Sequence, residues 1–62
     1  MLDDKKIGLY VLEKRKMHQL TQKQLADQLN ISFQAVSRWE KGLSIPAVDL
    51  LNELANLAFN DD

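Results

Sequence analysis

Helix start and stop signals follow one another so closely in the middle of this chain that only short helices joined by tight turns can form there. Thr21 is a favourable helix N-cap, and Gln24 stands three residues later, where the partner in a capping box belongs. Asn30 ends this helix, because asparagine tolerates the left-handed backbone conformation that a tight turn needs. Ser32 caps a second helix, which Gly42 brings to an end. The spacing predicts two helices of about eight to ten residues, joined by a turn of about three.

Apolar periodicity predicts one further helix on each side of this pair. The first runs from Ile7 to about His18, along a stripe interrupted by Lys14, whose methylene groups can cover apolar surface. Pro46 favours the first turn of a last helix. That helix is expected from about residue 47 to residue 59, with an inward face of Val48, Leu51, Leu54, Ala55 and Ala58. Four helices with short connections predict a compact all-α fold of one domain.

The composition excludes several classes of function. The 62 residues include no cysteine and one histidine, so that disulfides, cysteine-based zinc sites and histidine metal clusters are excluded, and we expect no metal and no cofactor. No nucleophile or glycine-rich loop accompanies the carboxylates, so we expect no enzyme activity and see no sign of a small-molecule ligand. No uncharged stretch approaches the roughly 20 apolar residues of a membrane span, and the first residues, Met1 to Asp4, lack the basic region followed by an apolar run that is typical of a signal peptide. We therefore expect a cytoplasmic protein without a membrane partner.

The net charge of −1 hides an uneven distribution. Residues 5–41 carry all eight lysines and arginines and only three acidic residues, whereas both ends of the chain are acidic. This segregation is compatible with a basic working face on an acidic chain. Charge alone nevertheless favours the simpler interpretation, in which these residues belong to ordinary solvated helix faces.

The two central helices have the geometry of a helix-turn-helix motif over residues 21–40. Ala26 is small enough for a close helix crossing, Asn30 suits the turn, and Val36 can hold the second helix against the first. Trp39 and Tyr10 fall on inward stripes and are predicted to be core residues. The opposite face of the second helix is free to enter a major groove and carries Gln34, Ser37, Arg38 and Lys41.

This ordered set of residues resembles the Cro/repressor type of helix-turn-helix, also called the xenobiotic-response-element family. The resemblance covers nearly everything from Ile7 to Ala58. It rests on Leu20-Thr21-Gln22, Gln24-Leu25-Ala26 with Leu29, Ile31-Ser32, Ala35 to Gly42, and Pro46 with Leu50-Leu51 and Leu54-Ala55. It implies that residues 1–62 form a repressor-like DNA-binding domain of a bacterial or phage transcriptional regulator. It also implies sequence-specific binding of double-stranded DNA, as a homodimer.

The resemblance further implies a role for individual side chains. The base-contacting positions correspond to Ser32, Phe33, Gln34, Ser37 and Arg38. The positions that contact the DNA backbone correspond to Gln22, Lys23, Lys41 and Ser44. Arg15 and Glu40 correspond to an ion pair between the first helix and the end of the recognition helix, which we assign to architecture.

The chain departs from the family pattern at Asn30, where glycine is usual, at Lys14, where an apolar residue is usual, and at Phe59, near an expected glycine. The family domain continues into a fifth helix, so the resemblance implies that this helix and any C-terminal domain are lost after residue 62; a complete four-helix protein is the alternative. An alternative function is a protein-interaction module of the same fold, of the antitoxin or antirepressor type. The residues that favour a protein contact are Leu43, Leu50, Leu57 and Phe59.

Overall fold

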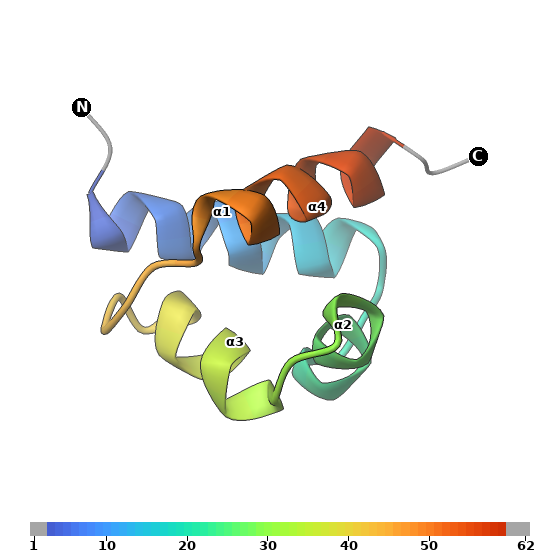
Figure 1. Ribbon diagram of the computed structural model, residues 1–62, viewed down its shortest axis with the longest axis horizontal. Coiled ribbons are helices and arrows are strands. Elements are labelled where there is room, and N and C mark those ends of the chain that lie inside the picture. Colours follow the sequence, from blue (N-terminus) through green and yellow to red (C-terminus); the bar gives the residue numbers. More distant parts are fainter. Residues whose placement is uncertain (1–2, 60–62) are drawn as a thin grey trace.

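The computed structural model describes residues 3–59, and the side chains of residues 3–57. The described residues form helices and turns without a strand, which confirms the all-α prediction. The helices are α1 (Asp4–Met17), α2 (Gln22–Leu29), α3 (Phe33–Glu40) and α4 (Val48–Phe59). Figure 1 shows α2 and α3 together on one side of the molecule, with α1 and α4 on the other. No helix within residues 3–59 combines the length and the apolar character needed to cross a membrane.

Helix α1 begins three residues before the predicted start at Ile7. The Asp3 side chain is the N-cap and accepts a hydrogen bond of 2.8 Å from the backbone N–H of Lys6. Apolar periodicity could mark only the first buried residue, Ile7, whereas the helix itself begins at its cap. Lys14, which interrupts the apolar stripe, is accommodated by Tyr10: its ammonium lies 5.6 Å from the centre of the Tyr10 ring, within the range of a cation–π contact.

The caps of α2 and α3 lie where the sequence predicts them. Thr21 Oγ1 accepts from the backbone N–H of Gln24 at 3.0 Å, and Gln24 Oε1 accepts from the backbone N–H of Thr21 at 2.8 Å, so the capping box is complete. Asn30 has a left-handed backbone with φ of 59°. Ser32 Oγ accepts from the backbone N–H of Ala35 at 3.4 Å, and Gly42 has φ of 77° beyond the end of α3. These local contacts define a short helix pair with a tight connection.

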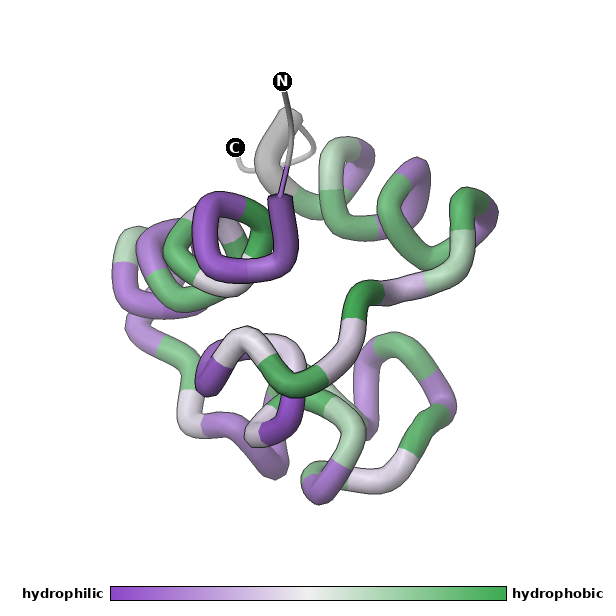
Figure 2. Tube along the Cα trace, turned by 90° about the vertical axis from the view of Figure 1, so that its left-hand side faces the viewer, coloured by the Kyte–Doolittle hydropathy of each residue, from purple (hydrophilic) through white to green (hydrophobic). Residues whose placement is uncertain are grey.

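All four helices contribute to one hydrophobic core. Its buried residues are Ile7, Val11, Leu25, Ala26, Leu29, Val36, Trp39 and Leu54. Trp39 is therefore a core residue, as predicted, and Tyr10 is half-buried and packs against the core. Figure 2 shows hydrophobic and hydrophilic residues alternating along each helix, as expected for amphipathic helices around a shared interior. Burial of each large aliphatic side chain contributes about 1.5–3 kcal/mol.

The inward face of α4 differs from the predicted one. Val48 was expected to face inward but is 75% exposed, because it opens the helix six residues before the buried Leu54 and points to a different side. Leu50 and Leu57 instead pack partly against the core, next to the half-buried Leu51. The predicted inward position of Ala58 lies outside the described side chains. Leu51, Leu54 and Ala55 lie inward as predicted, so the buried face keeps the centre of the predicted stripe and includes Leu50 and Leu57 in place of Val48.

Candidate nucleic-acid interface

The turn between α2 and α3 joins the two helices tightly. The backbone N–H of Ile31 donates to the carbonyl oxygen of Ala26 at 3.0 Å, which extends the hydrogen bonding of α2 past the left-handed Asn30. Ile31 is half-buried against the core, and Val36 on the first turns of α3 is fully buried. The orientation of α3 relative to α2 is therefore set by backbone hydrogen bonds and by core packing.

The face of α3 opposite the core is polar. Gln34 and Arg38 are exposed one turn apart, and Ser37 between them is half-buried. Phe33 opens the helix and is 48% exposed, as its position predicts. Ser32 is also exposed, but its hydroxyl already accepts the capping hydrogen bond from Ala35. The structure thus brings the five predicted base-contacting residues together at the start and along one face of a single helix.

An ion pair ties this helix to α1. Arg15 Nε lies 2.7 Å from Glu40 Oε2, and Arg15 Nη2 donates to Glu40 Oε1 at 3.1 Å. The third guanidinium nitrogen, Nη1, donates to the carbonyl oxygen of Leu20 at 2.9 Å. Both charged side chains are largely buried, with 15% and 8% of their surface exposed. A two-pronged contact of this kind restricts orientation as well as distance, so it holds the last residue of α3 against α1 and against the α1–α2 turn.

Glu40 has a further partner at the start of α2. Gln22 Nε2 donates to Glu40 Oε1 at 3.0 Å. Sequence reasoning missed this contact, because no periodicity relates two residues that lie on different helices and 18 positions apart. The contact places the N-terminus of α2 beside the C-terminus of α3. Lys23 and Lys41, which follow these two residues in the sequence, are both exposed near this junction.

The remaining predicted backbone-contacting residues lie in different surroundings. Lys23 Nζ is 3.8 Å from Asp27 Oδ1, one turn along α2, and both side chains are mostly exposed. Such a pair contributes little to stability and leaves the lysine available to another anion. Ser44 is half-buried in the segment between α3 and α4.

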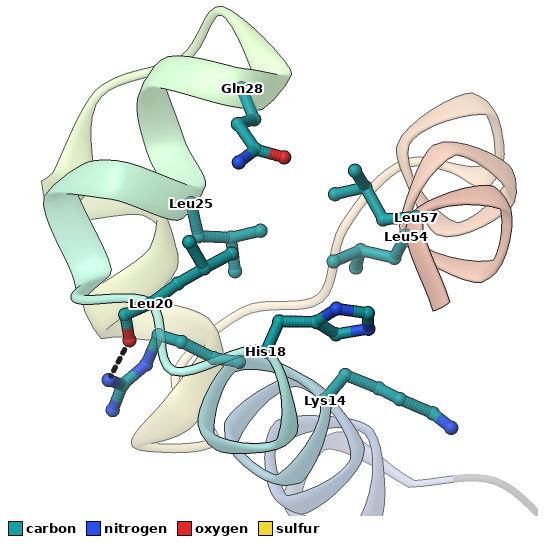
Figure 3. A pocket seen from close by; sticks show the side chains of 8 residues that line it. Lys14, His18, Leu20, Leu25, Gln28, Leu54 and Leu57 are labelled. Atoms are coloured by element: carbon teal, nitrogen blue, oxygen red, sulfur yellow. Dashed lines mark hydrogen bonds between the residues drawn. The ribbon is translucent and has the colours of Figure 1, made fainter. Parts of the chain in front are cut away.

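A separate cavity of about 150 Å³ lies between the C-terminal end of α1, α2 and α4 (Figure 3). Its lining comprises Lys14, Arg15, His18, Leu20, Leu25, Gln28, Leu54 and Leu57. None of the predicted DNA-contacting residues belongs to this set. Within the described part of the chain, no three histidine, cysteine, aspartate or glutamate side chains are grouped as metal ligands would be.

Comparison with known proteins addresses the same region of the chain. A family model described as helix-turn-helix matches residues 11–58, which span the second half of α1, all of α2 and α3, and nearly all of α4. No curated protein and no solved structure gives a significant match.

Proposed function

The chain belongs to the Cro/repressor-type helix-turn-helix family of DNA-binding regulatory domains, and on this premise we propose that it binds a specific duplex sequence with α3 in the major groove. The observation that carries the proposal is the polar face of α3, which is exposed while its opposite face is anchored in the core. A major groove is wide enough to accept one α-helix presented in this way.

Base recognition falls to the exposed side chains of α3. Arg38 can donate two hydrogen bonds to guanine, and Gln34 can pair with adenine through its amide. The exposed ring of Phe33 can pack on a thymine methyl group. Ser32 and Ser37 supply short hydroxyl groups at the start and in the middle of the same face.

Contacts to the phosphates set the register of the domain on DNA. Gln22 stands at the first position of α2, where the helix dipole and the backbone N–H groups favour a phosphate. Lys23 and Lys41 add positive charge near the junction of α2 and α3, and Ser44 contributes a hydroxyl from the following loop. These contacts are independent of sequence and therefore supply affinity rather than specificity.

The test is fluorescence anisotropy with a labelled random-sequence duplex over a range of salt concentrations, followed by selection and sequencing of the bound DNA. We expect binding that weakens steeply with salt and an enriched sequence motif. Absence of binding at low salt, or binding without enrichment of any motif, would contradict the proposal.

A second candidate function is protein binding, which the exposed apolar residues around the α3–α4 loop favour. Leu43, Ile45 and Val48 are 60%, 49% and 75% exposed. A hollow of about 280 Å³ between α1 and α4 adds apolar surface lined by Lys6, Ile7, Tyr10 and Leu51. Of the residues first considered for such a contact, Leu50 and Leu57 pack against the core instead, and the Phe59 side chain lies outside the described residues.

We propose a second copy of the chain as the partner, because a homodimer would present two recognition helices to two half-sites. Sedimentation of the purified chain over a range of concentrations tests this. A concentration-dependent dimer, weakened by Val48→Asp, is the expected result. A monomer at every concentration would contradict it.

A further inference from the structure

The Glu40 carboxylate determines which way the Gln22 amide points. Glu40 Oε1 accepts hydrogen bonds from Gln22 Nε2 at 3.0 Å and from Arg15 Nη2 at 3.1 Å. An ionised carboxylate can only accept hydrogen bonds, so the nitrogen of the Gln22 amide, and not its oxygen, must face Glu40. The amide orientation thus follows from the chemistry of its partner.

This orientation leaves one amide hydrogen of Gln22 available. The nitrogen carries two hydrogens, and one of them forms the hydrogen bond to Glu40. A DNA phosphate is also an acceptor only, so the side chain of Gln22 can bind it only through the second hydrogen of the same nitrogen. Gln22 is the first residue of α2, so this hydrogen accompanies the backbone N–H groups at the start of that helix. Without Glu40 the Gln22 amide could turn its oxygen towards the phosphate, and the phosphate would repel that oxygen.

The charge of Glu40 would oppose a nearby phosphate if it were not balanced. Arg15 balances it through two guanidinium nitrogens, with Nε at 2.7 Å from Oε2 and Nη2 at 3.1 Å from Oε1. Both partners are largely buried, so solvent screens the attraction between them only weakly. The pair therefore offers Gln22 an anchoring acceptor without adding a net negative charge to the interface.

We infer that Glu40 is a positioning residue for DNA-backbone binding: neutralised by Arg15, it holds the Gln22 amide so that one N–H is presented to a phosphate. This role rests on the proposed function, and it assigns to Glu40 more than the architectural contact between α1 and α3. Glu40 itself does not touch the DNA.

A double-mutant cycle on DNA affinity tests the role. The variants are Gln22→Met, Glu40→Ala and the two combined, measured by anisotropy on one duplex at one salt concentration. Gln22→Met should weaken binding about tenfold in the unsubstituted chain, the scale of one hydrogen bond to a charged group, and less than twofold in the Glu40→Ala background. Gln28→Met is the matched control, because Gln28 is exposed at the other end of α2 and should leave affinity within twofold.

Glu40→Gln is the control for a general loss of structure in the Glu40→Ala variant, because it keeps an oxygen acceptor at residue 40. Two donors converge on the Oε1 position and one on Oε2, so the glutamine oxygen should occupy the Oε1 position and still accept from Gln22. We therefore expect Gln22→Met to weaken binding again, by at least fivefold, in the Glu40→Gln background. Loss of this sensitivity in the Glu40→Gln chain would contradict the inference.

Nuclear magnetic resonance of the DNA-free chain gives a second readout. The two side-chain amide protons of Gln22 should be widely separated in chemical shift and should approach the values of Gln28 in the Glu40→Ala variant. An amide signal that does not respond to Glu40→Ala would overturn the inference. So would a Gln22→Met substitution that weakens DNA binding equally in the unsubstituted chain and in the Glu40→Ala chain. If the unsubstituted chain binds no DNA while the amide signal responds as expected, the proposed function fails although Glu40 does position Gln22.

Discussion

Gly8 of α1 lies so close to the backbone carbonyl of Trp39 in α3 that a Cβ atom at residue 8 would overlap the carbonyl oxygen. That oxygen also accepts a hydrogen bond of 3.0 Å from the backbone N–H of Gly42, beyond the end of α3. The missing side chain at Gly8 therefore lets α1 pack directly on the C-terminal turn of the proposed recognition helix. Together with the ion pair between Arg15 and Glu40, this contact determines how α3 is held.

Gly8→Ala should destabilise the domain by about 1–3 kcal/mol, because the added methyl group can be accommodated only if α1 moves away from α3. Urea denaturation followed by circular dichroism measures this change. Leu9→Ala is the control, since Leu9 is 57% exposed on the same helix and should change stability by less than about 0.5 kcal/mol. Equal effects of the two substitutions would show that the close crossing contributes nothing.

Arg15→Ala should destabilise the fold by about 2 kcal/mol or more, because it leaves the Glu40 carboxylate largely buried without its cation. Lys16→Ala is a matched removal of positive charge at the neighbouring exposed position and should change stability by less than about 0.5 kcal/mol. Thermal unfolding of the two variants under identical conditions makes the comparison. Similar midpoints would contradict a structural role for the pair.

Thr21→Ala should destabilise the domain by about 1 kcal/mol, because it removes the side-chain acceptor of the capping box and leaves the backbone N–H of Gln24 without its partner. Thr21→Ser keeps the hydroxyl group and should retain most of the stability. Denaturant titration of the two variants separates loss of the cap from loss of the methyl group. A serine variant as unstable as the alanine variant would argue against the cap.

Arg38→Ala and Lys23→Ala should weaken DNA binding in different ways. Loss of Arg38 should weaken binding to the selected sequence by about 1–3 kcal/mol and relax the preference at one base position. Loss of Lys23 should weaken binding evenly on all sequences and lower the salt slope by about one. Anisotropy titrations on selected and random duplexes make both measurements. An equal loss for Arg38→Ala on the two duplexes would contradict its assignment to base recognition.

The helix ends in the centre of the chain could be predicted because their determinants are local. Thr21 and Gln24 cap each other across three residues, Ser32 caps the next helix in the same way, and Asn30 adopts the left-handed backbone by itself. The start of α1 differs from the prediction although its cap, Asp3, is equally local, because the residues between the cap and Ile7 are polar and carry no apolar periodicity. Exposure of Phe33 was also predictable from its place on the helix.

In the candidate site, too, features that depend on local spacing could be predicted, and features that depend on contacts between helices could not. Its polar residues on α3 could be predicted as a set, since their spacing along one helix places them on one face. The contact of Gln22 with Glu40 could not, because it depends on where the start of one helix meets the end of another. The exposure of Val48 is of the same kind, because it depends on how far the start of α4 lies from the core.

Capping, turn geometry and periodicity act between residues a few positions apart, so the amino-acid sequence alone predicts the helix pair, its turn and the polar face of α3. Tertiary packing, by contrast, places Gly8 against Trp39 and exposes Val48 at the start of α4. It also brings Arg15 and Gln22 together, so that both donate hydrogen bonds to the Glu40 carboxylate. These relationships arise from the packing of whole helices, which brings together residues that lie far apart in the sequence.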